Sequence, residues 1–329
     1  RRIRSQAAMM PVETFCRLGR ALEALRPDDE AVRQAAAENP WFTPETVCRA
    51  ARALAQQMLT RDRLEKWMAL YPALPVPVPR RVRIVMAGNI PMVGFFDLLC
   101  VLMAGHRAEV KYSGKDSVMM RWIADRLKAW DPSLTIEETE AEIDAVIATG
   151  GESANRHFRA QYAALPALLR GSRQSVAVLC GAESDEELRG LSDDIFAYSG
   201  LGCRNVSLLF VPHGYDVRLT VPSLCEPYRN NYRQQRALCR LAGRAAVDIG
   251  GALLLEQRCF PTALSTISVA RYDRLSEVED WLAAHDGELQ CVVSRCIEHG
   301  RRVDFGQAQS PALTDYPDAA DVMKFLAEL

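Results

Sequence analysis

The amino-acid sequence predicts an α/β fold built on a mostly parallel sheet with helices on both faces. Three observations support this prediction: a helical first eighty residues, a proline-rich connector at residues 71–79, and a regular alternation of strand and helix patterns after it. Ligands of such sheets bind at the carboxyl ends of the strands, so the residues that follow each strand are the first candidates for a functional site.

Length and composition are those of an ordinary globular protein of two compact domains, or of three if one is small. The 329 residues include 40 Lys and Arg and 42 Asp and Glu, a formal net charge of −2, and 49% of them are hydrophobic. The missing basic excess argues against a chain-wide nucleic-acid-binding role, and the apolar content excludes intrinsic disorder. Ten scattered cysteines without a CxxC pair favour thiols in a reducing cytoplasm over disulfides or a metal site.

The first eighty residues are predicted to be helical. Apolar residues recur on one helical face at Phe15, Leu18, Leu22 and Leu25. A further helix is expected to begin at Thr43-Pro44-Glu45, which combines a hydroxyl cap, a first-turn proline and an acid near the positive end of the helix dipole. The prolines of residues 71–79 then predict an extended connector.

Strand and helix patterns alternate after the connector. In the first block, strands are expected at Val82–Ala87, Ala108–Tyr112, Asp144–Ala148 and Ser175–Cys180, and helices at Gly94–Ala104, Ser117–Trp130 and Ala154–Ala164. In the second block, strands are expected at Asn205–Val211, Leu264–Ala270 and Gln290–Ser294, and helices at Asp185–Tyr198, within Arg218–Leu241, at Leu275–Ala284 and at Ala319–Glu328.

One apolar stretch, residues 84–105, carries a single formal charge and is long enough to cross a bilayer. Two glycines, an asparagine and a proline between residues 88 and 94 interrupt it near its start. A buried strand, a turn and a buried helix are therefore predicted, with no membrane span.

Several common signatures are absent from the sequence: GxGxxG after the first strand, GxxxxGK[ST], HExxH and GxSxG. The usual Rossmann phosphate loop, a P-loop, a zinc-peptidase site and a serine nucleophile elbow are therefore not predicted.

Cys203 is the candidate nucleophile. It ends the turn Ser199-Gly200-Leu201-Gly202-Cys203 and is followed by a predicted strand. Glycines permit strained backbone angles and close approach, so a thiol on this turn can face a cleft, and Arg204 beside it would favour the thiolate. A buried cysteine next to a tight turn is an equally good reading of the spacing alone.

Two residues at the ends of predicted strands could face a ligand. Asn89 directly follows a buried strand and could donate hydrogen bonds from its amide, although a turn-forming Asn beside Gly88 explains it as well. Lys111 lies near the end of the next strand and could bind a cofactor hydroxyl or phosphate, or could be a solvated edge charge.

The run Thr149-Gly150-Gly151-Glu152-Ser153 forms a glycine-containing turn between a strand and a helix. Backbone N–H groups at the start of a helix bind anions, so Thr149, Gly150, Gly151 and Ser153 are candidate cofactor-binding residues. A single glycine pair is weak support, because many such turns look alike.

Taken in order, these features resemble the aldehyde dehydrogenase superfamily, and more closely its LuxC-type fatty acyl-CoA reductases. The resemblance rests on an Asn two residues before Pro91, a strand-end lysine, a Thr-Gly turn, and a Gly-x-x-Cys turn followed by Phe210-Val211. It extends from about Val82 to Ser294, and the closing segment Phe305–Gln309 is also similar to short acyl-CoA reductases.

This resemblance implies an aldehyde dehydrogenase-like fold with two doubly wound α/β domains, a cleft between them and a helical N-terminal segment. The implied boundaries are a helical segment at 1–80, a nicotinamide-cofactor-binding domain at 81–180, a catalytic domain carrying the cysteine at 181–295, and a segment at 296–329 that returns to the cofactor domain.

The resemblance also implies roles for individual residues: Cys203 as nucleophile, the Asn89 amide and the Cys203 backbone N–H as oxyanion donors, and Lys111 and the Thr149–Ser153 turn as cofactor contacts. Hydrolytic relatives carry a water-activating Glu in a Glu-Leu-Gly-Gly strand end. The run taken to correspond here is Val178–Ala182, which has no acid, with Glu183 displaced from the position. Loss of a positioned base disfavours hydrolysis of a thioester.

The implied function is NADPH-dependent reduction of a fatty acyl thioester, from acyl-CoA or an acyl-protein, to the aldehyde through an acyl-cysteine. NADH remains possible, and Arg107 or Lys115 could bind the 2′-phosphate of NADPH. Two alternatives stay open: a semialdehyde-forming reductase that uses acyl phosphate, and a non-catalytic partner subunit. A homodimer is expected from the resemblance, with no metal and no nucleic-acid partner.

Overall fold

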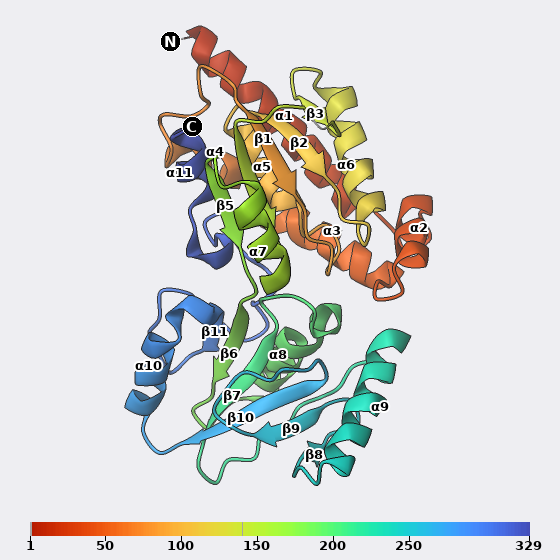
Figure 1. The fold of residues 1–329 in the computed structure, drawn as a ribbon, viewed down its shortest axis with the longest axis vertical. Coiled ribbons are helices and arrows are strands. Elements are labelled where there is room, and N and C mark those ends of the chain that lie inside the picture. The colour runs from red at the N-terminus through yellow and green to blue at the C-terminus, as the bar shows by residue number, and fades with distance from the viewer. Residues whose placement is uncertain (1, 140) are drawn as a thin grey trace. The chain divides into compact units, whose positions relative to one another are not determined.

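The computed structural model describes residues 2–139 and 141–329, which form two compact units (Figure 1). The first unit contains the described residues up to Ser172 together with Ala312–Leu329, and the second contains Arg173–Pro311. Each unit is built around its own sheet.

Four helices open the first unit: α1 (Arg2–Glu23), α2 (Glu30–Glu38), α3 (Pro44–Met58) and α4 (Arg61–Ala69). Helix α3 begins where the sequence predicts it. Thr43 and Thr46 form a reciprocal cap, in which the Thr46 N–H donates to Thr43 Oγ1 at 3.2 Å and the Thr43 N–H donates to Thr46 Oγ1 at 2.9 Å. The predicted proline-rich connector follows α4 and leads to the sheet.

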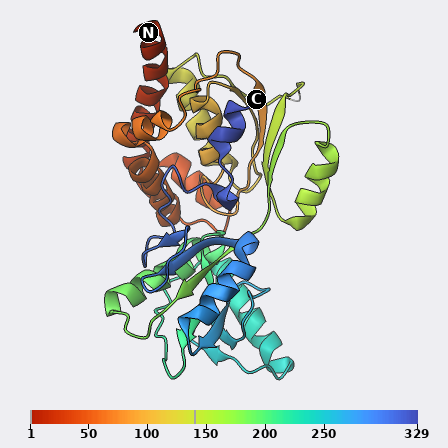
Figure 2. The same cartoon turned by 90° about the vertical axis from the view of Figure 1, so that its left-hand side faces the viewer.

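The sheet of the first unit is parallel throughout its described strands, in the order β3 (Ile136–Glu137), β2 (Arg107–Lys111), β1 (Arg81–Val85), β4 (Ala145–Thr149) and β5 (Ala167–Arg170). From β1 the chain moves outward through α5 (Phe95–Met103) and α6 (Ser117–Trp130), and from β4 it moves the opposite way through α7 (Glu152–Gln161). Right-handed crossovers therefore place α7 on the other face from α5 and α6, as Figure 2 shows.

The closing segment of the chain packs on the first unit through a short 3₁₀ turn, η3 (Pro317–Ala319), and α11 (Val322–Ala327). Tyr316 anchors it by accepting a hydrogen bond from the Trp67 indole N–H at 2.8 Å and by pairing with the Tyr71 hydroxyl at 2.5 Å. His106 Nε2 lies 2.9 Å from the carbonyl oxygen of Leu326. These contacts join the last helix to α4, α5 and β2.

The sheet of the second unit has the described order β12 (Arg302–Val303), β11 (Leu289–Ser294), β6 (Gln174–Val178), β7 (Val206–Pro212), β10 (Thr266–Tyr272), β9 (Leu253–Glu256) and β8 (Val247–Asp248). Only β8 pairs antiparallel among these strands. A parallel sheet with helices between its strands is what the sequence predicts.

Three helices and two 3₁₀ turns connect these strands: α8 (Asp185–Phe196), η1 (Ala197–Gly200), α9 (Glu226–Leu241), α10 (Leu275–Ala284) and η2 (Asp286–Glu288). Helix α10 buries Trp281 against Phe210 of β7, with ring centroids 5.0 Å apart. The β6–α8–β7 and β10–α10–β11 crossovers run in opposite directions along the sheet, so α8 and α10 cover opposite faces.

The predicted elements agree well with the observed ones where the pattern is strong, and Ser117–Trp130 and Leu275–Ala284 have the predicted bounds. Five described strands are missing from the prediction. Three of them, β3, β8 and β12, are only two residues long, and the other two are β5 with the sequence ALLR and β9 with the sequence LLLE. Leucine and alanine favour helix by local propensity. Pairing of β5 with β4, and of β9 with β10, overrides that preference.

The apolar stretch at residues 84–105 contains the end of β1, a turn and the fully buried helix α5. This is the strand, turn and helix that the sequence predicts. In the part of the chain that the structure describes, no helix has the length and apolar character that a bilayer crossing requires.

Candidate functional site

The candidate residues of the first unit gather at the carboxyl edge of its sheet. Lys111 is the last residue of β2 and is paired with Val85, the last residue of β1, and Val85 is paired with Ala148 of β4. Asn89 follows β1 by four residues, and Thr149 ends β4. This edge between β1 and β4 is where the winding direction of the sheet reverses, the place where doubly wound folds bind ligands.

The turn that carries Asn89 is held against the loop after β2. A Cβ on Gly88 would lie 2.3 Å from Ser113 Oγ, so only glycine permits this close approach. The Met86 N–H donates to the Lys111 carbonyl oxygen at 3.1 Å. Asn89 itself is half-buried. Two predicted site residues are therefore tied together through backbone contacts.

Asp116 also stabilises this turn, and the sequence analysis did not identify it. Met92, at φ 57°, donates its N–H to Asp116 Oδ2 at 2.6 Å. Burial raises the pKa of the Asp116 carboxyl to about 8, even though the hydrogen bond from Met92 lowers it. The signal available in the sequence was an aspartate at the start of a helix, which alone suggests only a cap.

The raised pKa of Asp116 predicts a pH-dependent stability. Between about pH 4 and pH 8 the folded protein retains a proton that the unfolded chain releases, so the free energy of unfolding falls by up to about 1.4 kcal/mol per pH unit as pH rises. Asp116→Asn removes this slope. Urea unfolding at pH 5, 6, 7 and 8 measures it.

The matched control for Asp116 is Asp125→Asn on the same helix, α6, where Asp125 is 71% exposed and paired with Lys128 at 3.1 Å. This control should keep the wild-type pH dependence. If the free energy of unfolding depended on pH equally in the wild type and in Asp116→Asn between pH 5 and pH 8, the raised pKa of Asp116 would be contradicted.

The Thr149–Ser153 turn leads directly from β4 into α7. A Cβ on Gly150 would lie 2.8 Å from Ala154 Cβ. A Cβ on Gly151 would have open space around it, because its nearest neighbour, Ser172 Oγ, would be 4.0 Å away. Gly151 and Ser153 are exposed at the amino end of the ten-residue helix α7. The exposed start of this helix can bind an anionic group through its N–H groups.

Asn155 fixes this turn and was not identified from the sequence. Its buried side-chain amide donates to the carbonyl oxygens of Gly150 at 2.9 Å and of Arg170 at 2.7 Å. Because the Gly150 N–H also donates to the Arg170 carbonyl at 3.1 Å, the ends of β4 and β5 are joined at the turn.

Cys203 is exposed and precedes β7 by three residues. It therefore lies at the amino edge of the sheet in the second unit, where the carboxyl-edge rule would not have placed a site. The residues before it are strained: Tyr198 and Ser199 are buried at φ 50° and 56°, and Gly200 is at φ 70°. Left-handed backbone at non-glycine residues costs about 1–2 kcal/mol each and is common at functional turns.

Asn205 holds the Cys203 turn in place. Its buried side-chain amide donates to the carbonyl oxygens at the end of α8, those of Asp194, Ile195 and Ala197, at 3.1, 3.1 and 2.9 Å. Its Oδ1 accepts the Gly202 N–H at 2.8 Å. The sequence offered no signal for this role, because the bonded partners are set by how α8 meets the turn.

Further contacts fix the backbone around the thiol. Ser175 on β6 donates its hydroxyl to the Cys203 carbonyl oxygen at 2.9 Å. Arg204 Nε donates to the Ala308 carbonyl oxygen at 2.6 Å, which joins the turn to the Phe305–Gln309 segment. Asp194 accepts the N–H groups of Gly306 and Ala308 at 2.7 and 2.9 Å. The closing segment that the sequence singled out thus packs beside Cys203.

The expectation that Val178–Ala182 occupies the water-activating position is wrong. This run leaves the carboxyl end of β6, while Cys203 precedes the amino end of the neighbouring strand β7. Five strand residues, about 16 Å, separate the two edges. The absence of an acid from this run is therefore no evidence about whether water can be activated to hydrolyse an acyl group on Cys203.

Glu183 lies at that same far edge. Its carboxylate accepts the N–H groups of Cys180 and Gly181 at 2.6 and 3.1 Å. Burial raises the pKa of Glu183, but these hydrogen bonds outweigh burial and hold the pKa below its ordinary value. Glu183 is a structural carboxylate of its own loop.

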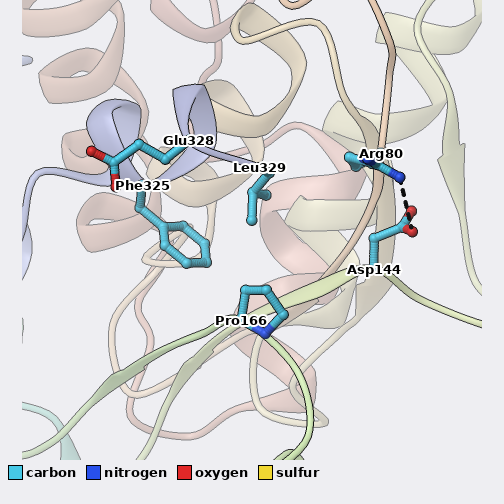
Figure 3. A pocket seen from close by; sticks show the side chains of 6 residues that line it. All are labelled: Arg80, Asp144, Pro166, Phe325, Glu328 and Leu329. Atoms are coloured by element: carbon cyan, nitrogen blue, oxygen red, sulfur yellow. Dashed lines mark ion pairs between the residues drawn. The ribbon is translucent and has the colours of Figure 1, made fainter.

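A separate open pocket of about 410 Å³ lies at the amino edge of the first unit's sheet. Arg80 and Asp144 precede β1 and β4 and are paired at 3.8 Å (Figure 3). Phe325 and the last two residues of the chain line its other side. None of the predicted site residues lines this pocket.

Several solved structures that are similar to this chain are aldehyde dehydrogenases or other oxidoreductases. An aldehyde dehydrogenase from Bacillus cereus in complex with NAD⁺ is 13% identical, with 87% of this chain and 71% of that chain covered and a TM-score of 0.58. An oxidoreductase from Marinobacter aquaeolei is 12% identical, with 93% and 79% covered and a TM-score of 0.64.

A third structure is an NADP-dependent glyceraldehyde-3-phosphate dehydrogenase from Bacillus halodurans complexed with NADP. It is 12% identical, with 87% and 73% covered and a TM-score of 0.60. These likenesses confirm the aldehyde dehydrogenase-like fold that the sequence predicts.

The sequence comparisons complete the assignment. No curated protein matches the chain. The family model described as acyl-CoA reductase (LuxC) matches residues 17–220, which include the Asn89 turn, the Thr149–Ser153 turn and Cys203. The chain therefore belongs to the LuxC acyl-CoA reductase family.

Proposed function

We propose that this protein reduces a fatty acyl thioester to the aldehyde through an acyl group carried on Cys203, with a nicotinamide cofactor as reductant. The observation that carries the proposal is an exposed cysteine on a strained turn that Asn205 and Ser175 hold rigidly. Membership of the LuxC family supports an enzyme that acts on acyl groups.

The carboxyl edge of the first unit's sheet fits a dinucleotide. The open space at Gly151 and the exposed start of α7 suit the pyrophosphate, and the exposed Lys111 suits a ribose hydroxyl. Arg107 cannot bind a 2′-phosphate at this edge, because it begins β2 and lies at the opposite edge. Lys115 is exposed in the loop after β2 and is the remaining candidate for the proposed NADPH preference.

The proposed reaction has two stages on Cys203. The thiolate attacks the carbonyl carbon of the thioester, the bond to Cys203 Sγ forms, the bond to the donor sulfur breaks, and the donor leaves as a thiol after taking a proton. The side-chain amide of Asn89 and the Cys203 backbone N–H would stabilise the oxyanion, with each donor contributing about 3–4 kcal/mol. A bound nicotinamide cofactor would supply a hydride to the acyl carbon. Cleavage of the carbon–Sγ bond then releases the aldehyde and restores the thiolate.

The test follows each stage separately. Mixed with an acyl-CoA alone, the protein should gain the mass of one acyl group, and peptide mapping should place it on Cys203. Addition of NADPH should then remove the acyl group and release one aldehyde for each cofactor oxidised. Cys259 is also exposed in the second unit and serves as the internal control, because it should stay unmodified.

Three results would contradict the proposal. Acylation at another residue would exclude Cys203 as the acyl carrier. Reduction of an acyl phosphate but not of acyl-CoA would favour the semialdehyde-forming alternative. Failure to bind either NADPH or NADH would favour the non-catalytic partner subunit.

A further inference from the structure

Helix α9 of the second unit presents a row of arginines that the proposed reaction does not use. We call Arg229, Arg233, Arg236, Arg240 and Arg244 the arginine row. Spacings of three and four residues place the four members within α9 along one side of the helix, and Arg244 continues the row just beyond it. Arg236 is half-buried and the other four are exposed.

The arginine row concentrates positive charge on a chain that carries a formal net charge of −2. Glu226 is paired with Arg229 at 2.5 Å and with Arg233 at 3.4 Å, and Asp248 is paired with Arg236 at 3.0 Å. The two acids thus pair with three of the five arginines. Exposed pairs of this kind contribute at most about 1 kcal/mol, so the arginines can exchange them for partners on another molecule.

Large apolar side chains are also exposed on α9 and on the neighbouring strand β8. Leu238 and Leu241 on α9 are 49% and 85% exposed, and Val247 on β8 is 63% exposed. Strand β8 is the last strand at this end of the sheet, and α9 lies beside β8 and β9 (Figure 1). Leu238 is two residues from both Arg236 and Arg240, which places it on the other side of the helix, so the arginine row is a charged surface and not a mixed one.

The arginine row begins next to the nucleophile turn. Cys225 directly precedes α9, and its Sγ lies 3.2 Å from the hydroxyl of Ser199, four residues before Cys203. Asn231, in the second turn of α9, accepts a hydrogen bond from Ser265 at the start of β10, at 2.8 Å. Helix α9 thus starts at the same edge of the sheet as Cys203 and extends about 24 Å along the unit.

We propose that the arginine row is a docking surface for an acidic protein that carries the acyl group as a thioester, which is the chemistry of an acyl carrier protein. The inference rests on the proposed function, because a molecule bound beside Cys203 is best explained as the one that delivers the acyl group. Acidic side chains on the carrier would replace Glu226 and Asp248 as partners of the arginines.

The test compares one acyl chain on two donors, coenzyme A and an acidic acyl carrier protein. Arg233→Glu/Arg240→Glu should lower kcat/KM for the protein-borne donor at least about tenfold, because charge reversal removes steering and adds repulsion. It should leave kcat/KM for acyl-CoA within about twofold. The wild-type preference for the carrier should weaken as salt rises from 50 to 300 mM.

Arg274→Glu is the matched control, since Arg274 is 78% exposed in the same unit but lies at the start of α10. Arg274→Glu should change kcat/KM for neither donor. An equal loss for both donors in Arg233→Glu/Arg240→Glu would overturn the proposal, because the arginines would then act on coenzyme A or on the fold. An unchanged carrier reaction would also overturn it.

A binding measurement separates this inference from the proposed reaction. Fluorescence anisotropy with the labelled, unacylated carrier protein requires no turnover and can use Cys203→Ser. Binding that disappears in Arg233→Glu/Arg240→Glu supports the docking surface even if the wild type reduces neither donor, in which case only the proposed function fails. Equal or tighter binding of duplex DNA or of phosphatidylserine vesicles through the same arginines would overturn the assignment to a carrier protein.

Discussion

Cys203→Ser is expected to abolish thioester-dependent cofactor oxidation, with kcat lower by at least about 10³-fold. Removing the nucleophile of a comparable acyl-transfer enzyme costs up to about 10⁶-fold. The serine hydroxyl would keep the size of the side chain, and the backbone contacts of the turn to Ser175 and Asn205 do not involve the sulfur. The measurement is NADPH oxidation with saturating acyl-CoA, together with the intact mass after incubation with acyl-CoA alone.

Two comparison variants sharpen this result. Cys259→Ser changes the other exposed cysteine of the second unit and should retain full activity and acylation. Asn89→Ala should slow turnover by about 10²–10³-fold, because one oxyanion donor is lost. The site of acylation should still be Cys203. Undiminished turnover in Cys203→Ser would remove this cysteine from the mechanism.

Asn205→Asp is expected to destabilise the second unit by about 3 kcal/mol or more. Three carbonyl oxygens at the end of α8 now accept from the Asn205 amide, and a carboxylate would replace that donor with a negative charge. Burying an unpaired charge beside acceptors is among the most costly substitutions. Urea unfolding with the fluorescence of Trp281, which lies in this unit, measures the change.

Asn205→Ala keeps the argument testable if the aspartate variant does not fold. We expect it to release the Cys203 turn, so that kcat falls more than the free energy of unfolding alone explains and the rate of Cys203 alkylation by iodoacetamide changes. Asn230→Asp on α9 makes the same chemical change at an exposed asparagine and should alter stability by no more than about 0.5 kcal/mol. A change in stability equally small in Asn205→Asp would contradict the role given to Asn205.

Much of the fold could be predicted because local signals and tertiary contacts agree. Ser117–Trp130 has a clear helical pattern, and its helix has the predicted bounds. Strand β5 could not be predicted, because the four residues Ala-Leu-Leu-Arg become a strand only by pairing with β4. Short segments without β-branched residues depend on their neighbours in space for their conformation.

Some features of the candidate site could likewise be predicted from the sequence, and others depend on tertiary contacts. The glycines before Cys203 indicated a tight turn, and the structure shows Gly200 in the left-handed conformation. Asn155, Asp116 and Asn205 could not be found, because each acts on a backbone group from another element. The mistaken water-activating position at residues 178–182 has the same origin, since a linear pattern does not show which end of a strand faces Cys203.

The sequence by itself determined the alternation of strands and helices, the glycine turn with its cysteine, and the family to which the chain belongs, because these depend on residue type and spacing along the chain. Only the tertiary structure decided that Cys203 lies at the amino edge of its sheet and that Arg107 lies away from the carboxyl edge of the other. It also decided that the arginine row begins beside the nucleophile turn. These relations arise from strand order and register, which bring distant residues together and which no local pattern encodes.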